Sequence, residues 1–126
     1  MKIDKIQADI DETDYWDSQL LDFTIRYCGD EAEIIFENND NMVYVITFFY
    51  CKNVEYTTDA SNRWNNLKVR EMNRLQMPYY VQDISVLEDM NECFFEFQLN
   101  IYPIYIRIVC KNIKIDKKIY EGATSF

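Results

Sequence analysis

The stretch MVYVITFFYC, residues 42–51, contains no charged side chain. A strand that is apolar on both sides usually lies at the centre of its sheet, where both faces are covered. We therefore predict that residues 42–51 form a central strand and that another element packs across it. The preceding run NNDN, residues 38–41, is typical of a turn, because Asn and Asp tolerate left-handed backbone.

Other segments alternate between apolar and polar residues, which is typical of a strand with one face in water. The apolar face of the first is formed by Leu21, Phe23, Ile25 and Tyr27. Gly29 and Asp30 then predict a two-residue hairpin turn into the next strand. The segments with this pattern are residues 21–27, 32–36, 79–87, 93–101 and 104–115.

A helix that covers the sheet is predicted at about residues 62–76. Its apolar side chains fall near one helical face, and Pro78 prevents its continuation. Residues 1–19 are ambiguous between a short helix and an extended arm. Ile3, Ile6 and Ile10 share one helical stripe there, but Asp and Thr then interrupt the pattern.

The predicted fold class is α+β. We expect a mainly antiparallel sheet of about six strands, with one helix (about 62–76) packed on it and a possible short N-terminal helix. The length of 126 residues fits a single domain, residues 1–126, without a low-complexity linker between its halves.

The charge is concentrated in one half of the chain. Residues 1–50 hold 3 Lys or Arg and 12 Asp or Glu, whereas residues 51–126 hold 10 of each. Because nucleic-acid binding requires a net basic face, DNA and RNA are excluded as expected partners. A basic protein is a better match, since complementary fields speed encounter; the alternative is that the acidity serves solubility alone.

The residue types argue against the commonest catalytic machinery. The chain has no His, which removes the usual proton carrier and the Ser-His-Asp and Cys-His sites. Gly29 and Gly122 are its only glycines, so a Gly-rich phosphate loop is excluded. The acids of DIDETD, residues 9–14, lack the Gly and the distal Glu of an EF-hand loop. We predict no catalytic residue, no metal site and no cofactor.

The four cysteines, Cys28, Cys51, Cys93 and Cys110, are widely spaced and lie in or beside apolar segments. We interpret them as reduced, packed thiols, with a disulfide between Cys28 and Cys51 as the alternative. No apolar run approaches the roughly 18 residues that span a bilayer, and residues 1–5 do not resemble the start of a secretory signal. We expect a cytoplasmic protein without a membrane partner.

Acidic and aromatic side chains are the candidates for contact with a partner, because Tyr and Trp are favoured at interface hot spots. The alternative is that the aromatics complete a small core. Tyr102 and Tyr105 flank Pro103 at a predicted hairpin tip, where core packing explains them least. The predicted partner-binding residues are Asp9, Asp11, Glu12, Asp14, Trp16, Asp17, Tyr102 and Tyr105.

Two short motifs resemble those of small bacterial proteins of immunity or uncharacterised type. Trp16, Asp17 and Ser18 match an aromatic residue or His followed by Asp-Ser at the start of a strand. The set Ile46, Phe48, Cys51 and Val54 matches a later strand with an Ile-x-Phe core. The resemblance covers residues 16–54 and implies a protein that binds and neutralises a toxin, often a basic nuclease, without catalysis. This chain has Trp16 where such proteins often have His.

The sequence therefore predicts a non-catalytic, immunity-like protein-binding module of the cytoplasm, whose acidic N-terminal half meets a basic protein. The alternative is a small ligand-binding domain or carboxylate-dependent enzyme with a pocket between helix and sheet. A homodimer formed through an exposed strand edge or an aromatic patch is the third possibility.

Overall fold

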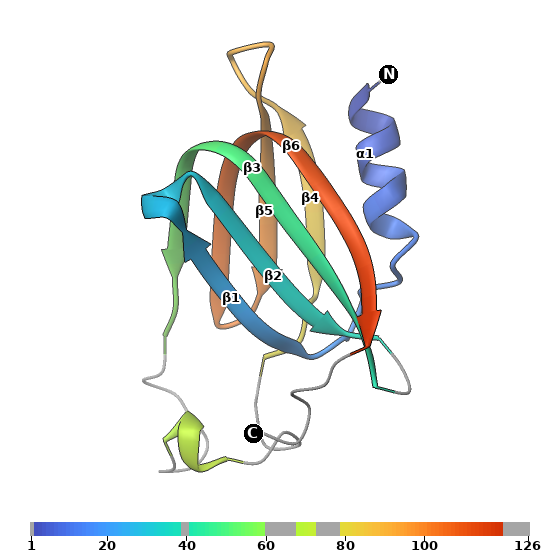
Figure 1. Cartoon of the computed structure of the whole chain (residues 1–126), viewed down its shortest axis with the longest axis vertical. Helices are drawn as coiled ribbons and strands as arrows, with labels where there is room; N and C mark the ends of the chain where they lie inside the picture. The colour runs from blue at the N-terminus through green and yellow to red at the C-terminus, as the bar shows by residue number, and fades with distance from the viewer. Residues whose placement is uncertain (1, 39–40, 60–67, 73–78, 120–126) are drawn as a thin grey trace.

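The computed structural model describes residues 2–38, 41–59, 68–72 and 79–119 (Figure 1). All neighbouring strands are antiparallel, in the spatial order β1-β2-β3-β6-β5-β4. The elements are α1 (Lys2–Asp11), β1 (Leu20–Arg26), the 3-10 turn η1 (Tyr27–Gly29), β2 (Glu31–Glu37), β3 (Met42–Thr57), the 3-10 turn η2 (Val69–Glu71), β4 (Asp83–Glu88), β5 (Phe95–Ile101) and β6 (Ile104–Ile119).

The predicted α+β fold with a six-stranded, antiparallel sheet is confirmed, and the N-terminal segment forms the helix α1. As predicted, residues 42–51 belong to a strand at the centre of the sheet. The helix predicted at about 62–76 lies mostly outside the described residues. Within its span, the structure describes the short turn η2.

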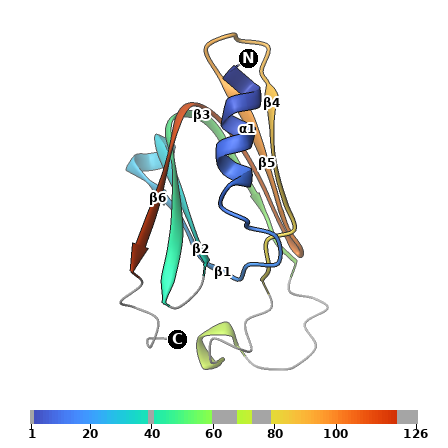
Figure 2. The same cartoon turned by 90° about the vertical axis from the view of Figure 1, so that its right-hand side faces the viewer.

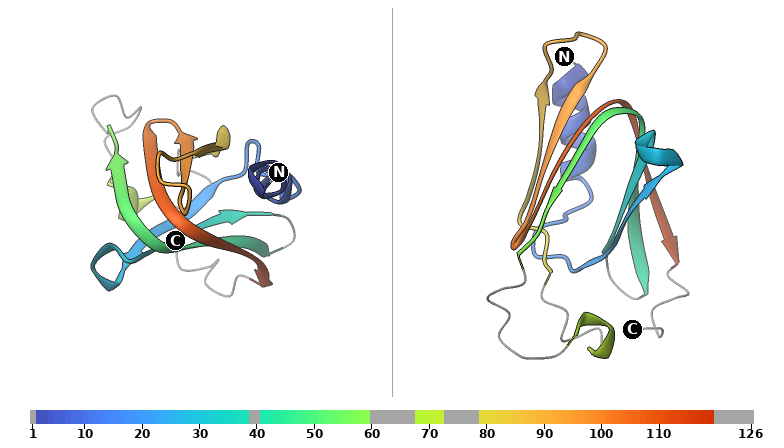
Figure 3. Two further views of the ribbon diagram at one scale, coloured as in Figure 1. Left: turned by 90° about the horizontal axis from the view of Figure 1, so that it is seen from above. Right: turned by 90° about the vertical axis from the view of Figure 1, so that its left-hand side faces the viewer.

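The sheet folds over on itself at the middle of its two longest strands, β3 and β6. β2 pairs with the part of β3 from Val43 to Phe49, whereas β5 pairs with the part of β6 from Ile104 to Cys110. Between these parts, Tyr50 has a φ of 56° and the register of β3 against β6 shifts. Such irregularities bend a strand, and Figure 3 shows both strands arching so that two arms of the sheet face each other.

The core fills the space between the two arms. Phe48 on one arm meets Phe97 on the other in an edge-on contact, with ring centroids 5.2 Å apart. Full burial of one large apolar side chain contributes about 1.5–3 kcal/mol, so this contact region holds the arms together. The largest fully buried side chains are Tyr15, Phe36, Phe48, Phe97, Ile10, Ile34, Ile46, Ile84, Leu99, Ile101, Ile106 and Ile108.

α1 closes one side of the folded sheet, beside the edge strand β4 (Figure 2). The amide nitrogen of Gln7 donates to the Ile84 carbonyl, and its amide oxygen accepts from the Val86 N–H, both at 2.9 Å. The buried hydroxyl of Tyr15 accepts from the Ile84 N–H at 3.1 Å and donates to the Ile84 carbonyl at 3.2 Å. These side chains occupy the backbone groups at this edge, which protects it from pairing with another strand.

The segments that lead into β1 and β4 pair with each other. The Asp17 N–H donates to the Val81 carbonyl at 2.8 Å, and the Leu20 N–H donates to the Tyr79 carbonyl at 2.8 Å. The first and last strands of the sheet are thereby joined at one end. The prediction of one strand over residues 79–87 is wrong in its first part, because β4 begins at Asp83 and the residues before it pair with the lead-in to β1.

The strand and turn around Gly29 also differ from the prediction. A register shift between Leu20 and Asp22 places Leu20 in the main core and Leu21 in a second buried cluster with Val43 and Val45, so Leu21 and Phe23 do not share one face. Tyr27 leaves the strand and is exposed. It begins η1, where φ is positive at three successive residues, and the hairpin turn is therefore longer than the predicted Gly29–Asp30 pair.

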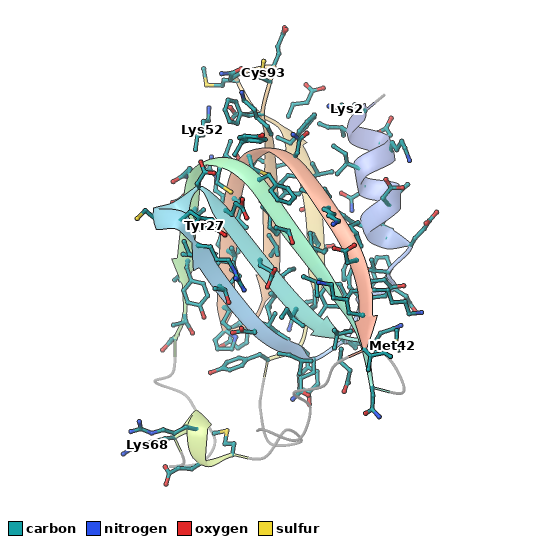
Figure 4. All side chains as sticks on the ribbon, viewed as in Figure 1. Lys2, Tyr27, Met42, Lys52, Lys68 and Cys93 are labelled. Carbon is teal, nitrogen blue, oxygen red and sulfur yellow. The ribbon has the colours of Figure 1, made fainter. Side chains whose placement is uncertain are left out.

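The cysteines are all free thiols, but the prediction that all four are packed is wrong for Cys28 and Cys93, which are exposed. Cys93 lies in the connection between β4 and β5 (Figure 4), where its N–H bonds the side chain of Asn91 instead of continuing the strand. Cys51 and Cys110 are cross-strand partners. Their mutual hydrogen bond lowers the pKa of Cys51 and raises that of Cys110, and burial raises the pKa of Cys110 further.

Candidate functional site

Residues of β1 and of the second half of β3 line a groove, and Figure 3, right, shows these two strands on the side of the molecule that faces away from α1. One cavity of about 460 Å³ is lined by residues that include Phe23, Ile25 and Tyr56. A second, of about 600 Å³, continues past Ile25 to Asp30 and Val54. Because Ile25 lines both, we treat them as one feature, the β1–β3 groove.

The walls of the β1–β3 groove are apolar and partly open to solvent. The rings of Phe23 and Tyr56 stack across it with centroids 5.3 Å apart. Ile25 is nevertheless 48% exposed and Tyr56 43% exposed. Partial burial of the Tyr56 side chain raises the pKa of its hydroxyl. A partly covered aromatic pair beside an exposed aliphatic side chain leaves apolar surface that a partner can bury.

The outer edge of β1 has backbone groups that do not face β2. The Asn38 N–H donates to the Met42 carbonyl at the end of the β2–β3 pairing. Because backbone hydrogen bonds alternate along an antiparallel pair, the even-numbered residues of β2 direct their N–H and C=O groups toward β3, and the odd-numbered residues direct theirs toward β1. Thr24 and Arg26 on β1 pair with the odd-numbered residues Glu33 and Glu31 of β2, so their backbone groups bond β2. It follows that Phe23 and Ile25 direct their N–H and C=O groups away from β2, along an edge with which no other strand of the described residues pairs.

Asp22 modifies this edge. Its Oδ1 accepts from the Phe23 N–H at 2.9 Å, and its Oδ2 accepts from the Thr24 hydroxyl at 3.1 Å. The first hydrogen bond agrees with the pairing pattern, because it shows that the Phe23 N–H is not used by β2. A carboxylate on an edge strand discourages indiscriminate pairing, since a neighbouring strand must accommodate its charge.

Two carboxylate residues, Asp22 and Asp30, are among the residues that line the β1–β3 groove, and further carboxylates lie on the opposite face of β2. From Leu20 to Glu37 the chain holds five carboxylates and one cation, Arg26, which pairs with Glu33 at 3.4 Å. Lys52 is the one lysine among the described residues that line the groove. It contacts Asp89 at 2.7 Å, and this hydrogen bond lowers the pKa of Asp89. Tyr27 and Lys52 lie on the same side of the molecule near η1 (Figure 4).

The structure places the predicted acidic residues on and after α1. Asp9 and Glu12 line a cleft of about 500 Å³ between α1 and β6, and Asp9 also pairs with Lys5 at 3.3 Å. Asp11 accepts from the Gln7 amide at 2.9 Å. Asp14 and Asp17 are exposed, with positive φ, in the turns that lead to β1.

The predicted aromatic residues lie elsewhere. Trp16 is exposed and stacks on Tyr15 with centroids 4.2 Å apart. Tyr102 and Tyr105 are exposed at the hairpin between β5 and β6, as predicted from Pro103. The eight predicted residues therefore come from three parts of the fold: α1, the lead-in to β1, and the β5–β6 hairpin.

The sequence prediction missed the residues of the β1–β3 groove. The sequence pattern places Phe23 and Ile25 on the apolar face of their strand; the structure packs Phe23 against the core but leaves Ile25 48% exposed. One sequence feature points to an edge strand here: Asp22 interrupts the otherwise apolar start of the strand. Tyr56 lies beyond the predicted end of its strand, because β3 continues to Thr57.

The described residues contain neither a metal-binding cluster nor a membrane-spanning helix. In this part of the chain, no three His, Cys, Asp or Glu side chains are grouped so as to hold a metal ion. None of its helices has the length and apolar character needed to cross a bilayer.

An apolar groove beside an open strand edge, with carboxylates around it, is the kind of surface that a protein-binding module presents. The comparisons identify the module. Residues 2–117 match the family described as "Immunity protein PIM7", and the chain therefore belongs to this family. Membership confirms the resemblance to immunity proteins and supports an immunity-like, protein-binding role.

Among solved structures, the chain is similar to an uncharacterised protein from Neisseria gonorrhoeae. The two share 15% sequence identity with a TM-score of 0.53, over 81% of this chain and 92% of the other. At this identity the likeness shows the fold alone. No curated protein matches the sequence.

Proposed function

We propose that this protein binds a basic toxin in the cytoplasm and neutralises it, with the acidic first half of the chain as the contact surface. The observation that carries the proposal is the apolar β1–β3 groove, which Asp22 and Asp30 line, in the acidic half of the chain. Membership of an immunity family supports a toxin as the partner.

The distribution of charge along the fold supports a basic partner. Glu31 and Glu33 on β2 have Phe49 and Thr47 as neighbours on β3, without a cation between them and the centre of the sheet. The lysines Lys114, Lys117 and Lys118 follow on β6, beyond β3. The electrostatic field is therefore negative on the β1–β2 side, whereas on the β6 side lysines compensate the acidic charge. Such an asymmetric field orients a basic protein during encounter.

Neutralisation of a toxin by binding requires no chemistry from this chain. A binder only needs to cover the toxin's active surface or its substrate path, and affinity then depends on apolar anchors surrounded by matched charge. The β1–β3 groove offers the apolar part. The acidic residues predicted from the sequence, Asp9 to Asp17, lie on α1 and in the lead-in to β1, so they add to the net negative charge of the protein but do not line the groove.

The test is co-expression with any toxin domain that a neighbouring gene encodes, followed by calorimetric titration of the purified pair. We expect rescue of growth, and an affinity that weakens by about tenfold or more between about 50 mM and 300 mM salt. Glu31→Gln should weaken binding, whereas Glu92→Gln, in the β4–β5 connection, is the matched control. Failure to bind the toxin, or binding that ignores salt, would refute the proposal.

The cleft between α1 and β6 favours a second candidate, the ligand-binding domain or carboxylate-dependent enzyme with a helix–sheet pocket. Ile6, Ile113 and Ile115 line it together with the carboxylates of Asp9 and Glu12. The double variant Asp9→Asn with Glu12→Gln separates the two functions. If toxin binding and rescue are retained in this variant, the cleft is not the toxin site; their loss would favour the cleft over the β1–β3 groove.

A homodimer formed through the open edge of β1 would compete with the toxin for the same surface. Light scattering of the free protein at several concentrations tests for it. A monomer is expected, because two copies paired edge to edge would bring their Asp22 carboxylates close together.

A further inference from the structure

We propose that the toxin docks as an added β-strand on the open edge of β1, through an extended segment that alternates apolar and basic side chains. This inference rests on the proposed function and specifies its mode of contact. It commits to one occupant, a segment of the toxin, and its support is the backbone geometry of β1, the apolar groove beside it and the charge around it.

Among the residues that the structure describes, no strand pairs with the outer edge of β1, whereas side chains bond the outer edge of β4. Gln7 and Tyr15 occupy the edge groups of Ile84 and Val86 on β4. On β1, the Ile25 N–H and the carbonyls of Phe23 and Ile25 point away from β2. These groups have the spacing of the backbone hydrogen bonds between antiparallel strands. Such main-chain hydrogen bonds to an added strand supply affinity that does not depend on its side chains.

The pleat of the sheet determines which side chains the incoming strand carries. Side chains on the face of Phe23 and Ile25 enter the β1–β3 groove, where the Phe23–Tyr56 stack gives them an apolar surface. Those on the opposite face lie beside Thr24 and Asp22. Because successive residues of a strand alternate between faces, apolar and basic residues must alternate in the docked segment.

The carboxylates beside β1 select the charge of the segment. Asp22 lies on the edge strand itself, and Glu33, one strand further in, shares its charge with Arg26. A Lys or Arg of the incoming strand can contact Asp22 directly, whereas a second copy of β1 would place a like charge there. The same residue therefore admits a basic strand and opposes self-pairing.

A pair of variants at Ile25 tests the backbone contact. Ile25→Pro removes the outward N–H without removing a hydrogen bond to β2, since Pro is tolerated on edge strands whose N–H faces outward. Ile25→Val retains the N–H and serves as the matched control. With the neighbouring toxin as the probe, we expect Ile25→Pro to weaken binding by about tenfold or more and Ile25→Val to leave it within about threefold.

A second measurement does not depend on whether the proline variant folds. Amide hydrogen exchange of the wild-type complex should show new protection at Ile25, with unchanged exchange at Met90 in the exposed β4–β5 connection. Asp22→Lys should weaken toxin binding, and this loss should diminish at high salt.

The outcomes separate this inference from the proposed function. If the toxin binds the wild-type protein but the Ile25 amide stays unprotected, or Ile25→Pro binds as tightly as Ile25→Val, the strand-addition mode is overturned and the immunity role stands. If the wild-type protein does not bind the toxin, both are overturned. If the free protein is a dimer that Ile25→Pro dissociates, the edge serves self-association and the inference is likewise refuted.

Discussion

Removal of the Tyr15 hydroxyl tests whether side chains close the β4 edge. Tyr15 is 1% exposed, and its hydroxyl is the acceptor for the Ile84 N–H at 3.1 Å. In Tyr15→Phe this N–H loses its partner in a buried position, which costs about 1–3 kcal/mol. The Ile84 carbonyl keeps its other donor, the Gln7 amide at 2.9 Å. We therefore expect the free energy of unfolding to fall by about 2 kcal/mol.

A double-mutant cycle with Gln7 sharpens this prediction. Gln7→Leu alone should cost about 1 kcal/mol, because the partly buried Val86 N–H loses its acceptor. In the double variant the Ile84 carbonyl loses both donors, so the combined cost should exceed the sum by about 1 kcal/mol. Urea unfolding followed by linear extrapolation measures all three values.

The control is Tyr27→Phe, because Tyr27 is exposed and its loss of a hydroxyl should change stability by less than about 0.5 kcal/mol. The reasoning is refuted if Tyr15→Phe is as mild as this control, or if the two edge variants are strictly additive. Either result would mean that water replaces these hydrogen bonds and that the β4 edge is open. The choice of β1 over β4 as the docking edge would then lose its basis.

Further predictions concern pH, thiol reactivity and the core. Burial raises the pKa of Tyr15 to about 12, above its ordinary 10.0, so its contribution to stability is complete below pH 10 and is lost as the pH rises toward 12; Tyr15→Phe should lack this loss in urea titrations. The Arg107 hydrogen bond lowers the pKa of Glu96, so this contribution is complete above the ordinary glutamate value of about 4.3 and is lost as the pH falls below it; the acid slope of unfolding should flatten in Arg107→Met. A chromogenic disulfide reagent should modify Cys28 rapidly in the native protein and Cys110 only after unfolding, and equal rates would contradict the described burial. Phe97→Ala should cost about 3–5 kcal/mol by urea unfolding, and a cost below about 1 kcal/mol would show that the arms are not held by the Phe48 contact.

Local patterns in the sequence predicted that all six strands exist, although not where β3 ends or β4 begins. Alternation over residues 32–36 and the uncharged run 42–51 correspond to β2 and to the central strand β3, because a strand's period of two is a property of adjacent residues. The β5–β6 hairpin was likewise predicted from Pro103 between two apolar runs. The errors occurred where backbone irregularities decide the outcome, at the shift after Leu20 and at the turn that begins with Tyr27.

The sequence by itself determined the fold class, the acidic character of the first half and the lack of imidazole chemistry, because these follow from composition and short-range periodicity. The tertiary structure alone decided which strand edge is open. Gln7 reaches Ile84 across 77 positions and Tyr15 reaches it across 69, so both contacts join segments that only the folded chain brings together. Contacts of that span leave no local pattern, so the capping of β4 and the exposure of β1 could not be predicted from the sequence.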